Sequence, residues 1–284
     1  MLALAVPLAA LGAMASSALA TPKGEFAPFA DCPLSTPGLS GCIVAKTESG
    51  EFIIGKKTVP IKNVITLQGG FIENRKTHAL TFVGAADGNT LSKTPQSVPG
   101  GLAGLVNCPE ISNFFERLAC ELVFENKLTG VTATTELAAP ASSIGLNELS
   151  LLTATGTALS LPVKVKLENP LLGEECYVGS NAKPVVIELT TGTTSPPEPN
   201  KPIKGNTGTL ESNEAGSILT ISKNSLVNNS FAAPEAEGCG GIFSFLIDPI
   251  VNASVGVPSA AGHNTAILNG TLKQAGAEEV EESE

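Results

Sequence analysis

Serine, histidine and aspartate are the residue types in this chain that could perform hydrolysis, because a serine nucleophile needs a histidine base and an orienting acid. His263 could combine with Asp248 and with Ser230 or Ser259 to form such a triad. The sequence has no Gly-x-Ser-x-Gly turn that would raise a serine above a sheet. We therefore expect His263 to be a turn residue before a strand, and we predict no catalytic residues and no enzymatic activity.

Residues 50–58 approach the phosphate-binding pattern G-x-x-x-x-G-K-[ST], in which free backbone N–H groups surround the phosphates. Lys57 occupies the position where a magnesium-binding Ser or Thr would follow Lys56, and the residues between Gly50 and Gly55 are strand formers. We interpret the segment as a short strand between two glycine turns with a basic hairpin tip. This interpretation predicts no cofactor and no metal.

The six cysteines could bind a metal or form disulfides. Zinc sites need closely spaced pairs such as Cys-x-x-Cys, which this chain lacks, whereas an even number of cysteines in an exported chain favours disulfides. Two Cys-Pro dipeptides each open a short loop that ends at the next cysteine. This spacing favours three disulfides: Cys32–Cys42, Cys108–Cys120 and Cys176–Cys239. Cys239 stands among glycines, where a free thiol would be reactive, but a disulfide in a tight turn is our prediction.

The charge of the chain argues against a nucleic-acid partner, because such binding depends on Lys and Arg neutralising phosphates. The formal net charge is −10 and the isoelectric point is near 4.8. Five glutamates in the tail at 277–284 supply half of that charge. The chain has no Trp and one Tyr, so it offers few aromatic faces for stacking on sugars.

Residues 1–20 are uncharged, mostly apolar, and end in Ala18-Leu19-Ala20, a small-x-small site of the kind that signal peptidase cleaves. The basic residue that begins most signal peptides is missing, which a start codon placed too far downstream would explain. An uncleaved anchor is the alternative, since about 20 apolar residues can span a bilayer. We predict a signal peptide, a secreted or cell-envelope location, and no membrane span in the mature chain.

Short runs of β-branched and apolar residues between Gly, Asn, Asp and Pro turns are typical of strands. Expected strands lie at 42–46, 51–54, 58–61, 64–67, 79–83, 131–137, 158–167, 185–190, 217–221 and 263–272. Pro162 falls on the polar face of its segment, which favours an edge strand or a bulge. The pattern predicts a mainly β fold, an antiparallel β-sandwich or a barrel-like arrangement.

Two segments break the strand pattern. Residues 109–120 carry apolar side chains at helical spacing, which predicts one short helix there with its apolar stripe toward the core. Residues 245–251 could hold one helical turn, with Asp248 as its cap and Pro249 as its first residue.

The domain organisation follows from these patterns. We expect one disulfide-stapled β domain at 21–276, with a subdivision near 125–130 or at the proline-rich connector 193–203 as the alternative. We favour a loop at this connector, because the expected Cys176–Cys239 disulfide would span it. The acidic tail at 277–284 is expected to be solvated and disordered.

Several stretches of the chain resemble uncharacterised secreted proteins of high-GC Gram-positive bacteria (actinobacteria). They include residues 50–55, 66–70 and 161–170, and the region from Asn229 to Gly240. The resemblance covers most of the mature chain and implies export to an extracellular or cell-wall setting. It implies no activity and no site residues.

Three functional alternatives follow. The first is a structural or interaction protein of the cell envelope that binds another protein or a wall component. The second is an extracellular ligand-binding module with an apolar pocket between sheets, lined by residues such as Phe71, Phe82 and Phe243. The third is a hydrolase that uses His263.

Overall fold

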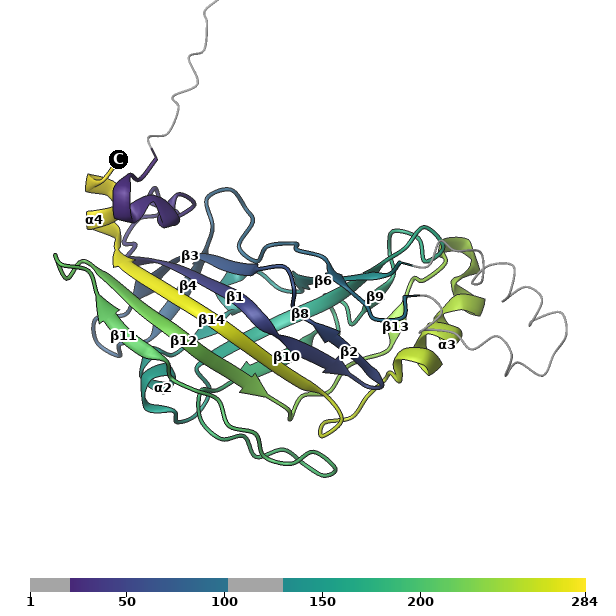
Figure 1. Ribbon diagram of the computed structural model, residues 1–284. Coiled ribbons are helices and arrows are strands. Elements are labelled where there is room, and N and C mark those ends of the chain that lie inside the picture. The colour runs from purple at the N-terminus through teal and green to yellow at the C-terminus, as the bar shows by residue number, and fades with distance from the viewer. Residues whose placement is uncertain (1–20, 102–129) are drawn as a thin grey trace, which may run out of the picture.

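The computed structural model describes residues 21–101 and 130–284. The chain is mainly β, and every pair of neighbouring strands is antiparallel (Figure 1). The expected helix at 109–120 and the expected Cys108–Cys120 disulfide lie outside the described residues.

The strands form two seven-stranded sheets. The first has the order β11-β12-β14-β1-β3-β4, with β2 paired to β1, and the second has the order β13-β9-β8-β6-β5, with β7 and β10 paired to β8. In the first sheet the strands are β1 (Gly41–Ile54), β2 (Lys57–Pro60), β3 (Ile65–Glu73), β4 (Leu80–Gly84), β11 (Thr209–Ser212), β12 (Ile218–Asn228) and β14 (Thr265–Gly276). In the second they are β5 (Gln96–Ser97), β6 (Thr132–Leu137), β7 (Gly145–Leu146), β8 (Leu159–Glu168), β9 (Tyr177–Val178), β10 (Val185–Leu189) and β13 (Ala236–Glu237).

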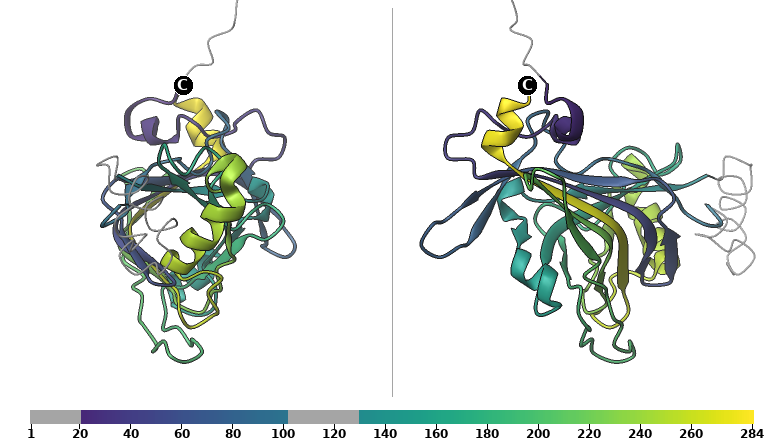
Figure 2. Two further views of the ribbon diagram at one scale, coloured as in Figure 1. Left: turned by 90° about the vertical axis from the view of Figure 1, so that its right-hand side faces the viewer. Right: turned by 60° about the vertical axis from the view of Figure 1, so that its left-hand side comes forward.

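Both sheets turn an apolar face toward one shared core. In β10, Val185, Ile187 and Leu189 are buried while the two residues between them are exposed, as the two-residue period of a strand requires. The sheets meet at one edge, where Thr190 and Val227 exchange two backbone hydrogen bonds of 3.0 and 2.8 Å. The end-on view in Figure 2 shows the two sheets curving around this common interior.

Two β-bulges bend the first sheet at one place. The register of β1 against β14 shifts between Thr47 and Ser49, and that of β12 against β14 shifts between Ile221 and Asn224. Both bulges lie beside Gly270, where an added Cβ would come within 1.8 Å of the Lys46 carbonyl oxygen. Bulges kink a strand and increase its twist, so this pair curves the sheet around the core.

The expectation that the strand containing Pro162 is an edge strand is wrong. β8 pairs with β10 on one side and with β6 on the other. The Pro162 carbonyl accepts a hydrogen bond of 3.0 Å from the Ala138 N–H, directly after β6 ends at Leu137. Proline has no N–H to donate to a neighbouring strand. Because Pro162 faces Ala138, directly after the end of β6, only the last hydrogen bond of the β6–β8 pairing is lost.

Three further boundaries differ from the sequence-based expectation. The expected strands at 42–46 and 51–54 are one strand, β1, with Gly50 inside it, and β3 continues through the glycines at 69–70 to Glu73. The expected helical turn at 245–251 is the helix α3 (Ser244–Val255), so Pro249 lies inside it rather than at its start. Asp248 does not cap this helix; its carboxylate accepts the Cys239 N–H at 2.7 Å.

The expectation of a disordered acidic tail is also wrong, because residues 277–282 form the helix α4 (Ala277–Glu282). Val280 is fully buried in a second, smaller core with Phe29 and Val44, while the glutamates of the helix remain exposed. The Lys23 N–H donates to the Ser283 carbonyl oxygen at 3.2 Å, so the lead-in and the tail lie together (Figure 1). The buried Val280 side chain and this backbone hydrogen bond hold the helix against the lead-in.

Two of the expected disulfides are present. Cys32–Cys42 joins the lead-in, which contains the 3-10 helix η1 (Gly24–Phe29), to β1, and Cys176–Cys239 closes a loop with a sequence separation of 63. All four cysteines are buried, and none of the cysteines within the described residues is free. None of the helices in residues 21–101 and 130–284 has the length and apolar character that crossing a membrane requires.

The proline-rich connector folds back on the body of the protein. Thr193 pairs with Lys204, and the Thr194 N–H donates to the Ile203 carbonyl oxygen at 2.9 Å. The Asn200 side chain donates to the backbone carbonyls of Asn229 and Asn264 at 3.0 Å each.

Candidate ligand-binding interior

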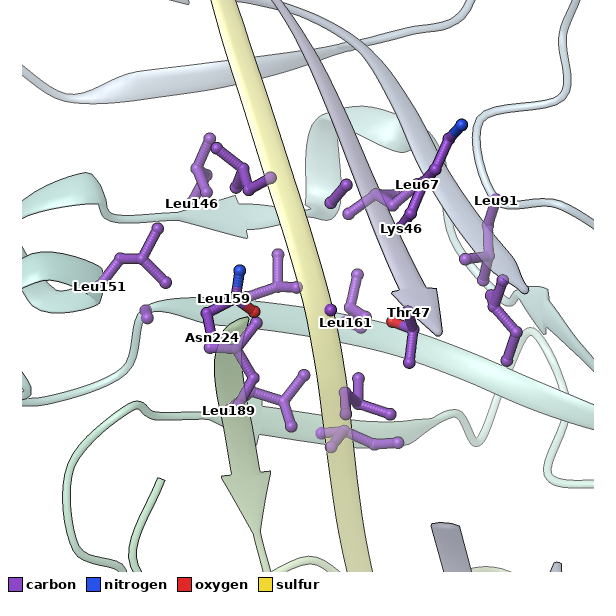
Figure 3. A pocket seen from close by; sticks show the side chains of 18 of the residues that line it. Lys46, Thr47, Leu67, Leu91, Leu146, Leu151, Leu159, Leu161, Leu189 and Asn224 are labelled. Carbon is purple, nitrogen blue, oxygen red and sulfur yellow. The ribbon is translucent and has the colours of Figure 1, made fainter. Parts of the chain in front are cut away.

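The core between the sheets is not completely filled. A cavity of about 70 Å³ lies between β1 and β14 of the first sheet and β8 and β10 of the second. Leu67, Leu91, Leu159, Leu161 and Leu189 surround it, as Figure 3 shows. Among the labelled side chains Lys46 directs its amine away from this cluster, and Asn224 uses its amide to donate to the Ile221 carbonyl oxygen at 3.0 Å.

Two smaller cavities adjoin the first. The second, of about 50 Å³, shares Phe52 and Thr135 with the first as lining residues and continues toward Val178 and Val255. The third, of about 60 Å³, lies on the opposite side and shares four lining residues with the first: Ile43, Leu146, Leu151 and Leu272. The second and third share no residue, so the three volumes follow one another through the interior.

The third cavity reaches the surface. Its wall includes Leu152 of the short helix α2 (Glu148–Thr153), Leu210 of β11 and Leu219 of β12, whose exposed fractions are 43%, 50% and 43%. In Figure 1, α2 lies next to β11 and β12. These side chains form an apolar mouth at one end of the interior.

A carboxyl group stands at this mouth. Glu148 lines the third cavity, and its Oε1 is buried without a hydrogen-bond partner. Burial raises the pKa of the Glu148 carboxyl, a hydrogen bond with Gln274 opposes this, and the charge of Glu73 adds to the increase. A carboxyl group that is shielded from water in this way ionises less readily.

An ammonium group stands at the other end. Lys57 lines the second cavity, together with Val59 and Val98. Burial lowers the pKa of Lys57, and the neighbouring charge of Lys56 lowers it further. The long interior therefore has a basic group at one end and an acidic group at the other.

The aromatic residues that we expected around a pocket fall in three different places. Phe82 lines the first cavity. Phe71 is buried against Gly41 and does not line any of the three cavities. The expectation for Phe243 is wrong: 57% of this residue is exposed, because it lies in the 3-10 turn η4 (Gly241–Phe243) at the start of α3.

The residues of the hypothetical triad are engaged elsewhere. His263 is exposed in the turn before β14, as expected, while Ser259 is buried and its backbone pairs with Ala233. The Asp248 carboxylate accepts the N–H groups of Gly238 and Cys239 at 3.3 and 2.7 Å. Within residues 21–101 and 130–284, no side-chain hydrogen bond joins His263 to Asp248, Ser230 or Ser259.

Two larger hollows on the surface are open and polar. One of about 420 Å³ lies beside Tyr177 and Glu237, and one of about 520 Å³ lies beside Lys166 and Glu168. The Tyr177 ring is already covered by Lys164, whose Nζ lies 4.4 Å from the ring centroid. Over residues 21–101 and 130–284, acidic, histidine and cysteine side chains form no group of three that could hold a metal ion.

The start of α3 carries a second apolar feature. Four neighbouring large side chains are exposed, and we call them the α3 ridge: Ile242, Phe243, Phe245 and Leu246. The opposite side of the same helix buries Val251 and Val255, and Val255 lines the second cavity. Exposed apolar patches of this kind usually mark contact surfaces.

Sequence reasoning missed both polar ends of the interior. The sequence pattern marked Lys57 only as a departure from a phosphate-binding motif. The two-residue spacing of Lys57 and Val59 could have shown that their side chains share a face of β2. Glu148 lies before the apolar residues of α2, and no pattern in the sequence distinguishes it from an ordinary first-turn glutamate. Neither protein-family models nor curated proteins nor solved structures match this chain.

Proposed function

We propose that this protein binds an elongated apolar molecule, such as a single alkyl chain, in the interior between its two sheets. The observation that carries the proposal is the row of three adjoining apolar cavities with a mouth at α2. Protein interiors usually contain few voids larger than a water molecule. At about 24 cal/mol per Å³, a void of 70 Å³ alone costs about 1.7 kcal/mol of stability.

The size of the cavities favours a chain over a compact ring. An engineered cavity of about 150 Å³ accommodates one benzene molecule, and each of the three volumes here is smaller, at about 50 to 70 Å³. A narrow ligand that extends through all three would use their combined volume, and the side chains that adjoining cavities share would move aside to admit it.

Calorimetric titration of the full chain with 1-dodecanol tests the proposal. We expect saturable binding of one molecule, which an Ala158→Leu substitution weakens by about tenfold or more, equivalent to about 1.4 kcal/mol. Ala158 is buried and lines the first cavity, so leucine would occupy the space of the ligand. Ala182→Leu, at an exposed position, is the matched control. Absence of saturable binding to the wild-type chain contradicts the proposal.

The chain would act outside the cytoplasm. This part of the proposal is supported by the leader pattern at 1–20, by two disulfides that bury their cysteines, and by the resemblance to secreted actinobacterial proteins. Two curved sheets around an apolar interior also suit the β-sandwich class that the strand pattern predicts. N-terminal sequencing after expression in a secreting host should give Thr21, and a chain that begins at residue 1 in the cytoplasm contradicts export.

The α3 ridge favours a second candidate function, binding of a partner protein that presents an apolar surface. The only charged residue of α3, Asp248, directs its carboxylate to the Gly238 and Cys239 N–H groups, so the ridge is free of charge. Pull-down from the cell surface should capture proteins that an Ile242→Ser/Phe245→Ser variant loses. The same set of proteins with both chains contradicts this candidate.

A further inference from the structure

Resting on the proposed function, we propose that the bound chain ends in a carboxylate, which Lys57 holds at the end of the interior formed by the β1–β2 hairpin. The ligand class is then a fatty acid. Its tail would extend past Phe52, through the first cavity and toward α2.

The register of β2 directs Lys57 inward. Lys57 pairs with Ile54 across the hairpin, and both residues line the second cavity. Val59, two residues later, lines the same cavity, while Thr58 between them is exposed. Residues two apart in a strand share a face, so the lysine side chain is on the apolar side of β2.

Lys57 has no partner of its own in the part of the chain that the structure describes. The lysines in ion pairs there are Lys164, Lys166 and Lys183. The neighbouring Lys56 is exposed and donates instead to the Ala253 carbonyl oxygen at 3.1 Å. Lys57 is partly buried, so its ammonium loses part of its hydration beside the apolar cavity, and an incoming carboxylate would compensate that loss.

The opposite end of the interior sets the orientation of the ligand. Glu148 would repel a carboxylate at the mouth, because its charge lies there and no hydrogen-bond donor of the described residues neutralises its buried Oε1. An anionic head group is therefore favoured beside Lys57, the lysine that lines the second cavity. The apolar tail then occupies the leucine-rich part of the cavities, where it needs no polar partner.

A competing explanation is that Lys57 only protects the edge of the sheet. Among the described strands β2 pairs only with β1, and inward-pointing charges on such edge strands discourage pairing with other chains. In that case Lys57 would have no influence on which head group binds.

Titration with dodecanoate, 1-dodecanol and dodecyltrimethylammonium, three probes with the same chain and different heads, separates these explanations. At pH 7 the wild-type chain should bind dodecanoate about tenfold more tightly than 1-dodecanol, and the cation most weakly. Lys57→Met should abolish the preference for dodecanoate while leaving 1-dodecanol binding within about threefold, and Lys57→Arg should retain the preference. Lys56→Met, next to it but outside the cavity, is the matched control and should keep the preference.

The failure of this inference can be told from the failure of the proposed function. Equal binding of dodecanoate and 1-dodecanol, or a preference that survives Lys57→Met, overturns the role of Lys57 and leaves the apolar site intact. Tightest binding of the cation overturns it too, and would place the head group at Glu148. If none of the three probes binds, both the inference and the proposed function are wrong. Melting curves of each variant establish that it is folded.

Discussion

Phe52 of β1 and Thr135 of β6 belong to different sheets, yet both line the first cavity and the second. They therefore lie where the two volumes adjoin. Under the proposed function an alkyl chain that occupies both volumes passes these two side chains, and we expect them to form a constriction that limits which ligands reach Lys57.

Replacing Phe52 with alanine should widen this constriction. We expect the Phe52→Ala variant to bind naphthalene, a ring that the wild-type chain excludes, and to lose about 2 kcal/mol of unfolding free energy because the ring is half-buried. Phe26→Ala is the control: Phe26 is also half-buried, but it packs in the second core beside Phe29. Naphthalene titration and urea unfolding of both variants provide the measurements. If the Phe52→Ala variant still does not bind naphthalene, Phe52 does not form a constriction between the two cavities.

Glu148 should make the protein less stable at neutral pH. Its pKa is raised in the folded state above the ordinary 4.5, so the folded chain binds more protons than the unfolded chain between the two values. Stability therefore falls as the pH rises through this window. We expect Glu148→Gln to raise the melting temperature at pH 7. Near pH 3 it should have no effect, because the wild-type carboxyl is protonated there and is as uncharged as the glutamine amide.

The exposed Glu278 of α4 provides the comparison for this experiment. Glu278→Gln should change the melting temperature little at either pH. An equal gain at both pH values for Glu148→Gln would show that the cost does not come from its charge.

The two disulfides should differ in their contribution to stability. In the chain-entropy description, closing a loop with a separation of 63 contributes about 4 kcal/mol and one with a separation of 10 about 3 kcal/mol. Replacing Cys176 and Cys239 by alanine should therefore cost more than replacing Cys32 and Cys42. Urea unfolding measures both losses, and the reverse order would mean that local packing outweighs chain entropy.

Val280 should anchor the C-terminal helix. Its side chain is fully buried, so Val280→Ala should cost about 2 kcal/mol and increase proteolysis of the lead-in that packs against α4. Glu281→Ala, the next residue and an exposed one, should stay within about 0.5 kcal/mol of the wild-type chain. A loss of the same size in both variants would point to helix propensity rather than burial.

Much of the fold could be predicted because it depends on local patterns. Alternation located β6, β8 and β10 closely, and the spacing of Cys-Pro with the next cysteine identified Cys32–Cys42. The errors have a common physical origin in long-range contacts. Pro162 is accommodated in a central strand because β6 ends beside it, and the acidic tail is ordered because a core receives Val280.

The candidate site was less accessible to sequence reasoning. A lysine or a glutamate becomes distinctive only through what surrounds it, and the walls around Lys57 and Glu148 come from strands far apart in the sequence. The bulges beside Gly270, which curve the sheet around the cavities, depend on the pairing of three strands. The need for an apolar pocket between sheets could be stated in advance, but only Phe82 of its expected lining was identified correctly.

Photo-crosslinking with 1-dodecanol that carries a diazirine in mid-chain tests the central claim most directly, because it maps where the chain lies. After peptide mapping, we predict label on β1 between Ile43 and Phe52, on β8 between Leu159 and Val163, and on β14 between Leu268 and Leu272, all of it displaced by unlabelled 1-dodecanol. Label that is confined to the α3 ridge, or that unlabelled 1-dodecanol does not displace, would contradict a binding site between the sheets.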